Sequence, residues 1–230
     1  MTTATLEPLV MSTLNIRSGR PEDAPFLAWA VLTASRGHLA SGWFDIALNR
    51  PESDCLAFLT QLTLTATESL WHYSRFLLVE EDTGAVATLS AFPAAEVYSI
   101  TPVAISQAVD ASGLPSEERT LIWERGSYAF ACTKPPRAEC LMIENVATLP
   151  GYRNRGYSSA LLERALDSGR SQELVEAQIT FLIGNHVAER LYTKAGFRFD
   201  NEWRDPTFQA KAGSPGLRRL VRSLAEGSSP

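Results

Sequence analysis

The segment from Val146 to Leu166, VATLPGYRNRGYSSALLERAL, constrains the fold more than any other part of the sequence. An apolar run ends at Pro150, a loop with two arginines and a glycine follows, and apolar residues then recur at helical spacing. This pattern predicts a buried strand that leads through a short basic loop into a helix packed on a sheet. Helix N-termini carry unpaired N–H groups and partial positive charge, so the loop is a candidate anion site.

The residue types in the loop suit a phosphate. Gly156 has no Cβ and lets the backbone come close to an anion, and Arg153 and Arg155 can add charge-assisted hydrogen bonds. The alternative is a solvated basic turn before an ordinary helix. A Walker phosphate loop is excluded because no G-K-[ST] follows, and a dinucleotide fingerprint is excluded because the G-x-G-x-x-G spacing is missing.

The elements around this loop predict a mixed sheet. CLMIENVATLP (140–150) reads as a central strand, AQITFLIG (177–184) as the next strand, and Asn185 and Gly196 as the start and end of a second helix. The other expected elements are a strand at 14–19, a helix from 21 to about 34, a loop with a short helical turn at 36–52, a helix at 52–68, a β-hairpin at 75–92, strands at FRFDNEWR and GLRRLVRSL, and a loop at 205–216 between them.

This order predicts an α/β fold with helices on both faces of the sheet. We expect one domain over residues 13–225, with an insertion at about 93–138 that has too few apolar residues for its own core and holds helical pieces at 102–111 and 116–127. Residues 1–12 and 226–230 are expected to be flexible ends.

Composition narrows the partners. A formal net charge of -5 argues against a nucleic-acid or anionic-membrane partner. The three cysteines, an odd number without C-x-x-C spacing, predict free thiols in a reducing cytosol rather than a metal site or a disulfide framework. No apolar run approaches the ~18 residues of a membrane span, and the first residues do not read as a secretory signal. We therefore expect a cytoplasmic protein with no metal.

Two motifs resemble those of the GNAT acyltransferase superfamily. RNRGYS is similar to its [QR]-x-x-G-x-[GA] signature through Arg153 and Gly156, whereas Ser158 departs from the usual Gly or Ala. IGNHVAERLYTKAGF (183–197) resembles the next unit of that family, in which an Asn opens a helix, a Tyr lies within it and Gly-Phe closes it. The resemblance implies the GNAT fold, with a central, mostly antiparallel mixed sheet, and it covers most of the chain outside the insertion.

The resemblance also implies acetyl-CoA as the donor substrate. In the family, backbone amides at this helix start hold the pyrophosphate, and the pantetheine arm enters where two strands splay apart. The positions that carry over to donor binding are Val146, Ala147, Thr148, Arg153, Asn154, Arg155, Gly156, Tyr157, Ser158, Ser159, Asn185, Ala188 and Tyr192.

Direct attack by an amine on the thioester sets three tasks. The resemblance assigns Tyr192 to the departing thiolate and a backbone N–H, that of Val146, to the oxygen that gains charge. The alternative for Tyr192 is a core tyrosine with its hydroxyl at the surface. Glu144 is the candidate base, because a carboxylate in a central strand is costly to bury without a purpose or a partner. Strand alternation would put it on one face with Met142, Val146 and Thr148. A Glu paired with an Arg, or a water acting as the base, are the alternatives.

The acceptor is not identified by the sequence. Trp43, Phe44 and Asp45 are candidate acceptor-binding residues, since the loop that holds them borders the acceptor pocket in the family; packing against the insertion is the alternative. The expected function is acetyl transfer to a primary amine of a small molecule or peptide. A non-catalytic acyl-CoA-binding module, another acyl donor and an O-acceptor are the rival readings. Family members are often dimers, so a homodimer is left open.

Overall fold

The structure is a computed structural model, and it describes residues 14–137 and 139–225. The ends expected to be flexible, 1–12 and 226–230, lie outside the described residues. Among the described helices, none combines the length and the apolarity that crossing a bilayer requires.

Within the described residues, seven strands form one mixed sheet in the order β1-β2-β3-β4-β5-β7-β6. Only β4 and β5 run parallel; every other neighbouring pair is antiparallel. The strands are β1 (Asn15–Ser18), β2 (Phe76–Glu81), β3 (Gly84–Pro93), β4 (Cys140–Thr148), β5 (Glu176–Leu182), β6 (Arg198–Arg204) and β7 (Gly216–Ser223). The predicted mixed, mostly antiparallel sheet is confirmed.

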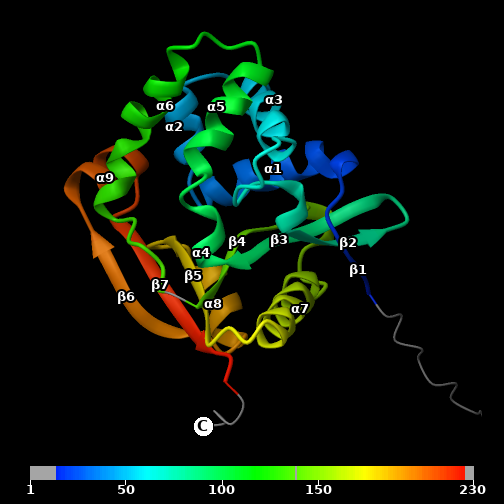
Figure 1. The fold of residues 1–230 in the computed structure, drawn as a ribbon. Coiled ribbons are helices and arrows are strands. Elements are labelled where there is room, and N and C mark those ends of the chain that lie inside the picture. Colours follow the sequence, from blue (N-terminus) through cyan, green and yellow to red (C-terminus); the bar gives the residue numbers. More distant parts are fainter. Residues whose placement is uncertain (1–13, 138, 226–230) are drawn as a thin grey trace, which may run out of the picture.

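Helices cover both faces of the sheet (Figure 1). α1 packs on β4 and β3 from one side, and α7 packs on β2, β3 and β4 from the other. The α-helices are α1 (Ala24–Arg36), α2 (Trp43–Leu48), α3 (Glu52–Thr63), α4 (Ala94–Val97), α5 (Thr101–Ala111), α6 (Glu118–Gly126), α7 (Tyr157–Ser171), α8 (His186–Lys194) and α9 (Pro206–Ala212). Short 3-10 turns are η1 (Pro21–Asp23), η2 (Tyr73–Arg75), η3 (Ser127–Ala131) and η4 (Pro150–Tyr152).

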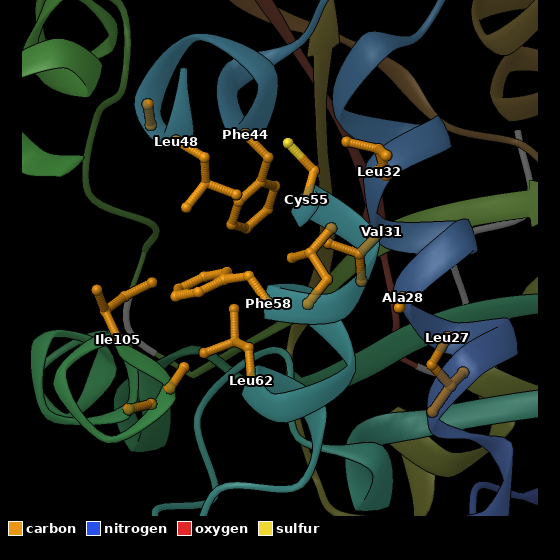
Figure 2. Close-up of a cluster of buried hydrophobic side chains, with 14 of the residues drawn as sticks. Leu27, Ala28, Val31, Leu32, Phe44, Leu48, Cys55, Phe58, Leu62 and Ile105 are labelled. Carbon is orange, nitrogen blue, oxygen red and sulfur yellow. The ribbon is translucent and has the colours of Figure 1, made fainter. Parts of the chain in front are cut away.

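The helical layer on the α1 side shares one hydrophobic core with the insertion. α1, α2 and α3 direct Leu27, Phe44 and Phe58 into a common cluster, which Figure 2 shows together with Ile105 of α5. The insertion helices α5 and α6 therefore complete the core of the neighbouring helices instead of enclosing a core of their own. Burial of such large apolar side chains is the main source of stability in this layer.

A second cluster lies between the sheet and α7. Leu161, Leu162, Ala165 and Leu166, the apolar stripe of the opening segment, are all buried against the strands. This packing anchors α7 beneath the ends of β3 and β4 and so fixes where its N-terminus points.

Two local predictions were wrong. The helix expected over 52–68 ends at Thr63, and the segment 205–216, expected as a loop, contains α9. Asp205 caps α9 by accepting a hydrogen bond from the Phe208 N–H at 2.8 Å, and Gly213 ends it at φ 81. The helix forms because Asp, Pro and Gly stand at the positions that favour a start, a first turn and an end.

Candidate active site

The parallel strands β4 and β5 part after three paired positions. Cys140, Leu141 and Met142 pair with Glu176, Ala177 and Gln178, and pairing stops there although both strands continue. Beyond Met142, the edge of β4 that faces β5 has no strand partner, so its backbone polar groups are left for another partner. The resemblance implies such a divergence, and the pairing of β4 with β5 shows it.

A β-bulge in β4 changes which side chains share a face. Ser90 pairs with Glu144 and Thr88 with Ala147, so Asn145 and Val146 together oppose one residue of β3. Asn145 adopts φ 53, and its Nδ2 donates a hydrogen bond to Ser90 Oγ at 2.9 Å.

The expected alternation along β4 was therefore wrong. Met142, Glu144 and Ala147 face the α1 side, because their β3 partners lie two residues apart from one another. Val146 packs against the α7-side cluster, and Thr148 contacts Ser158 of α7. One extra residue in the strand moves the last part of the pattern to the opposite face.

The basic loop forms an open helix start. Gly156 precedes α7 with φ 84 and has no side chain to cap the helix, and a Cβ built on it meets no described atom within 4 Å. The first intrahelical hydrogen bond runs from the Ala160 N–H to the Gly156 carbonyl, so the amides of Tyr157, Ser158 and Ser159 come before it and have no acceptor within the helix. Such donors, together with the helix dipole, are an arrangement that can bind an anion.

The two arginines of the loop keep their charge unpaired by carboxylates within the described part of the chain. Arg153 Nε donates to the Thr148 carbonyl at 3.4 Å, and Arg155 donates to the Gly151 carbonyl at 3.2 Å. The Arg155 guanidinium also lies 4.9 Å from the centroid of the Tyr152 ring. Both side chains are held near the helix start by weak neutral contacts, which leaves their positive charge available to an anion.

The remaining loop residues hold the helix to the sheet. Tyr157 is buried, and its hydroxyl bonds to the Glu81 carboxylate of β2. Ser158 Oγ lies 3.0 Å from Thr148 Oγ1, so the residue that departs from the family pattern joins α7 to the end of β4. Asn154, at φ 63, makes the turn between the two arginines.

Tyr192 occupies the expected helix and lies inside the α7-side cluster. Its side chain is 7% exposed, and its ring centroid lies 5.5 Å from that of Phe181 and 6.4 Å from that of Phe197. No described residue makes a hydrogen bond with its hydroxyl. Burial raises the pKa of Tyr192, so the phenol stays protonated at neutral pH and can donate a hydrogen bond.

The start of α8 is closed by its own side chain. Asn185 Oδ1 accepts a hydrogen bond from the Ala188 N–H at 3.2 Å. The predicted cap and the terminating Gly196, at φ 81, are confirmed.

Glu144 lies on β4 two residues beyond the last pair with β5. The Tyr98 hydroxyl donates a hydrogen bond to its Oε1 at 2.9 Å, and no described residue bonds Oε2. Burial raises the pKa of Glu144 above its ordinary value, and the hydrogen bond from Tyr98 opposes part of that rise. The alternative of an Arg partner is not seen among the described residues, and a carboxylate with a raised pKa is the stronger base.

The placement of Phe44, Asp45 and Trp43 favours structural roles over binding of an acceptor. Phe44 is 3% exposed and points toward Cys55 and Phe58 within the core (Figure 2). Asp45 makes two hydrogen bonds with Arg36, at 2.7 and 3.0 Å, and accepts the Gly42 N–H at 2.8 Å.

Arg36 therefore already neutralises the charge of the Asp45 carboxylate. Burial alone would raise the pKa of Asp45, but the hydrogen bonds from Arg36 and Gly42 outweigh it and lower the pKa. Trp43 is partly buried, and its Nε1 donates to the Gly126 carbonyl at 3.0 Å, which ties α2 to the insertion. The alternative of packing against the insertion fits this placement better than an acceptor role.

Sequence reasoning missed Tyr98. It lies at the end of α4 in the insertion, and no spacing relates it to Glu144, 46 positions away. Only the fold brings the two side chains together.

Comparison with known proteins agrees with this geometry. The family model described as "Acetyltransferase (GNAT) family" matches residues 44–197, more than half of the chain. Comparison with curated proteins gives no match.

Solved structures share the fold. A crystal structure of an acetyltransferase matches with a TM-score of 0.68 at 17% identity, over 92% of this chain and 100% of the other. An N-acetyltransferase from Staphylococcus aureus Mu50 matches with a TM-score of 0.64 at 21% identity, over 90% and 100%. At these identities the likeness concerns the fold.

Proposed function

Because the chain belongs to the acetyltransferase (GNAT) family, we propose that it is an acetyl-CoA-dependent N-acetyltransferase acting on a primary amine of a small molecule or peptide. The observation that carries the proposal is the divergence of β4 from β5 beside the uncapped, glycine-led start of α7. The divergence of the two strands would admit the flexible acyl arm of the donor, and the start of α7 would bind the anionic end of the same molecule.

The donor is proposed to bind along this path. The amides of Tyr157, Ser158 and Ser159 hold the pyrophosphate, with the charges of Arg153 and Arg155 beside them. Gly156 leaves the open space that a phosphate so close to the backbone needs. The acyl arm runs between the strands, and the other donor-contacting positions are Val146, Ala147, Thr148, Asn154, Asn185, Ala188 and Tyr192.

The reaction begins with a neutral amine. An alkylammonium has a pKa near that of lysine, about 10.4, so it must lose a proton before it can attack. The Glu144 carboxylate takes that proton, and the amine nitrogen then forms a bond to the carbonyl carbon of the thioester. The electron pair moves to the carbonyl oxygen, which the backbone N–H of Val146 stabilises.

Collapse of the intermediate breaks the C–S bond. The proton lost by nitrogen on becoming an amide balances the charge of the departing thiolate, so the products are the acetamide and free CoA thiol. Tyr192 assists by donating a hydrogen bond to the sulfur. Its raised pKa lies above that of a free thiol, about 8.5, so the phenol stabilises the thiolate rather than surrendering its proton.

Tyr192→Phe tests the chemistry. We expect kcat for CoA release to fall roughly tenfold to a hundredfold, the value of one hydrogen bond to a charged group. The melting temperature should stay near that of the wild type, because the hydroxyl has no partner among the described residues. The Kd of acetyl-CoA should also change little, because the hydrogen bond to sulfur becomes strong only as the thiolate forms. Stopped-flow detection of free thiol with an amine acceptor provides the rate, and an unchanged kcat would contradict the role.

A wider assay separates the rival functions. Acetyl-CoA should raise the melting temperature, and free thiol should appear with at least one member of an amine panel. Binding without thiol release on amines or alcohols would instead assign a non-catalytic acyl-CoA-binding module. Release only with alcohols would assign O-acyl transfer.

A further inference from the structure

The insertion brings a phenol to the candidate base. α4 follows β3 directly and contacts β4 (Figure 1). Tyr98 is the residue at the C-terminal end of α4. From there the Tyr98 hydroxyl reaches Glu144 Oε1 at 2.9 Å.

The Tyr98 ring is held in place by its surroundings. It lies edge-on to Phe92 of β3, with ring centroids 6.2 Å apart, and packs against a small buried cluster that includes Val97 and Met142. Thr101 Oγ1 bonds to the Val97 carbonyl at 2.9 Å and links α4 to α5. The phenol is therefore presented by a packed element and not by a mobile chain end.

The neighbouring strands and helix present the following side chains to the face of Glu144 within the described residues. β3 presents Ser90 opposite it, and β5 presents Gln178 opposite Met142 on the same face. The buried residues of α1, the helix packed on β4, are all apolar, and Arg36 at its end is paired with Asp45 and Glu52.

The titratable neighbours do not compete with Tyr98. Burial raises the pKa of Cys140, on the same strand, to about 11, so this thiol is neutral. Burial and the nearby Glu144 carboxylate also raise the pKa of Tyr98, which keeps it a donor throughout the working pH range. Among the described residues, Tyr98 is the group that interacts directly with the carboxylate.

We infer that Tyr98 is a positioning residue for Glu144, whose hydroxyl fixes Oε1, leaves Oε2 for the acceptor ammonium, and stabilises the charged, proton-accepting form of the carboxylate. The inference rests on the proposed function, in which Glu144 takes a proton from the amine. It gives the insertion a role in the chemistry beyond its share of the helical core.

The direction in which loss of the Tyr98 hydroxyl changes the pKa of Glu144 follows from two opposing influences on the carboxylate. Burial disfavours the carboxylate, and the hydrogen bond from Tyr98 favours it. Loss of the hydroxyl therefore raises the pKa of Glu144 further. The base is then protonated up to a higher pH, so kcat/KM falls on the acidic side and recovers at high pH.

Tyr98→Phe tests the inference, because it keeps the ring and removes only the hydroxyl. We expect the acidic limb of the kcat/KM profile to move upward by roughly one pH unit, the size expected for a hydrogen bond to a charged group. Carboxyl-carbon NMR can follow the titration of Glu144 in the absence of substrate, with Glu144→Gln used to identify its signal. The midpoint of that titration should move upward by the same amount in Tyr98→Phe.

The matched control is Tyr128→Phe. Tyr128 lies in the same insertion, is buried, and packs on Phe208 of α9 without a hydrogen bond from its hydroxyl in the described structure. Its profile and the Glu144 signal should match those of the wild type. In a Glu144→Gln background, Tyr98→Phe should have no further effect on the profile.

The outcomes separate the inference from the proposed function. If Glu144→Gln removes the acidic limb but Tyr98→Phe leaves both the limb and the NMR titration unchanged, the role of Tyr98 is overturned while the base stands. If Glu144→Gln keeps the limb at full activity, the base assignment fails and the positioning role fails with it. A shift in both measurements, absent in Tyr128→Phe, supports the inference.

Discussion

The two helices that follow the parallel strands begin in opposite ways. α8 starts at Asn185, whose side chain accepts a hydrogen bond from the Ala188 N–H at 3.2 Å. α7 starts at Gly156, which has no side chain, and its first amides find no acceptor among the described residues. Both helices contribute side chains to the same hydrophobic cluster against the sheet, so their surroundings do not explain the difference between the two helix starts.

The contrast separates a structural helix start from a binding one. A side-chain cap contributes about 1 kcal/mol to stability, and α7 forgoes it. Two arginines without a carboxylate partner in the described part of the chain stand at the same uncapped start. An arrangement that lacks its own acceptor and concentrates positive charge is one that a bound anion completes.

The largest expected effect comes from breaking the open start of α7. Gly156→Val places a β-branched residue at φ 84, where only glycine is relaxed, and fills the space of the cradle. We expect the Kd of acetyl-CoA to rise by roughly one to two orders of magnitude, through loss of one or two charge-assisted hydrogen bonds. Isothermal titration with acetyl-CoA measures it.

Gly113→Val is the control for backbone strain. Gly113 also has positive φ, at 63, and also has open space around it, but it lies between α5 and α6. Both variants should lose roughly 1–3 kcal/mol of stability, and only Gly156→Val should lose donor affinity. Equal donor affinity in the two variants would remove the distinction between the two helix starts.

A smaller effect is expected at α8. Asn185→Ala removes the cap and should lower stability by about 1 kcal/mol, or about 2–4 °C in melting temperature for a chain of this size. Asn185→Asp keeps the acceptor oxygen and should restore the melting temperature.

Donor binding at Asn185 is a separate readout. Asn185 is proposed to contact the donor, and its Nδ2 is the side-chain donor that the cap leaves free for this. Asn185→Asp should then still weaken acetyl-CoA binding roughly tenfold, about the value of one hydrogen bond. Unchanged Kd in Asn185→Asp would restrict Asn185 to its capping role.

The long-range order of the fold was predictable because each β–α unit carries its own local signals. The signals lie within or directly beside the elements that they define: apolar residues in the strands, Asn185 at the start of α8 and Gly196 after its end. α9 carried equally local signals in Asp205 and Gly213, and it was missed because the Gly and Pro content of 205–216 was interpreted as a loop.

The site was less predictable where its geometry depends on register. The bulge at Asn145 moves Val146 and Thr148 to the opposite face of the sheet. The bulge arises from the pairing of β4 with β3, which the sequence of β4 alone does not reveal. The contact of Tyr98 with Glu144 depends on how the insertion packs on β4. Phe44 shows the converse: the sequence left open whether this aromatic, in a loop with a short helical turn, lines a pocket or packs against the insertion, and α2 directs it into the core.

The smallest expected effect concerns Ser158, the position that departs from the family pattern. Its hydroxyl lies 3.0 Å from that of Thr148, so Ser158→Ala should lower stability by about 0.5–1.5 kcal/mol, the value of one neutral hydrogen bond. Donor Kd should change less than about twofold, because the proposed phosphate donor at this position is the backbone N–H, which alanine retains. Thr148→Val should cost a similar amount, and the double variant less than the sum, since the two hydroxyls are each other's partners. Additive losses of stability would mean that the hydroxyls act separately, and a large rise in Kd would mean that the Ser158 hydroxyl itself contacts the phosphate, making this α7 start depend on a side chain as the α8 start does.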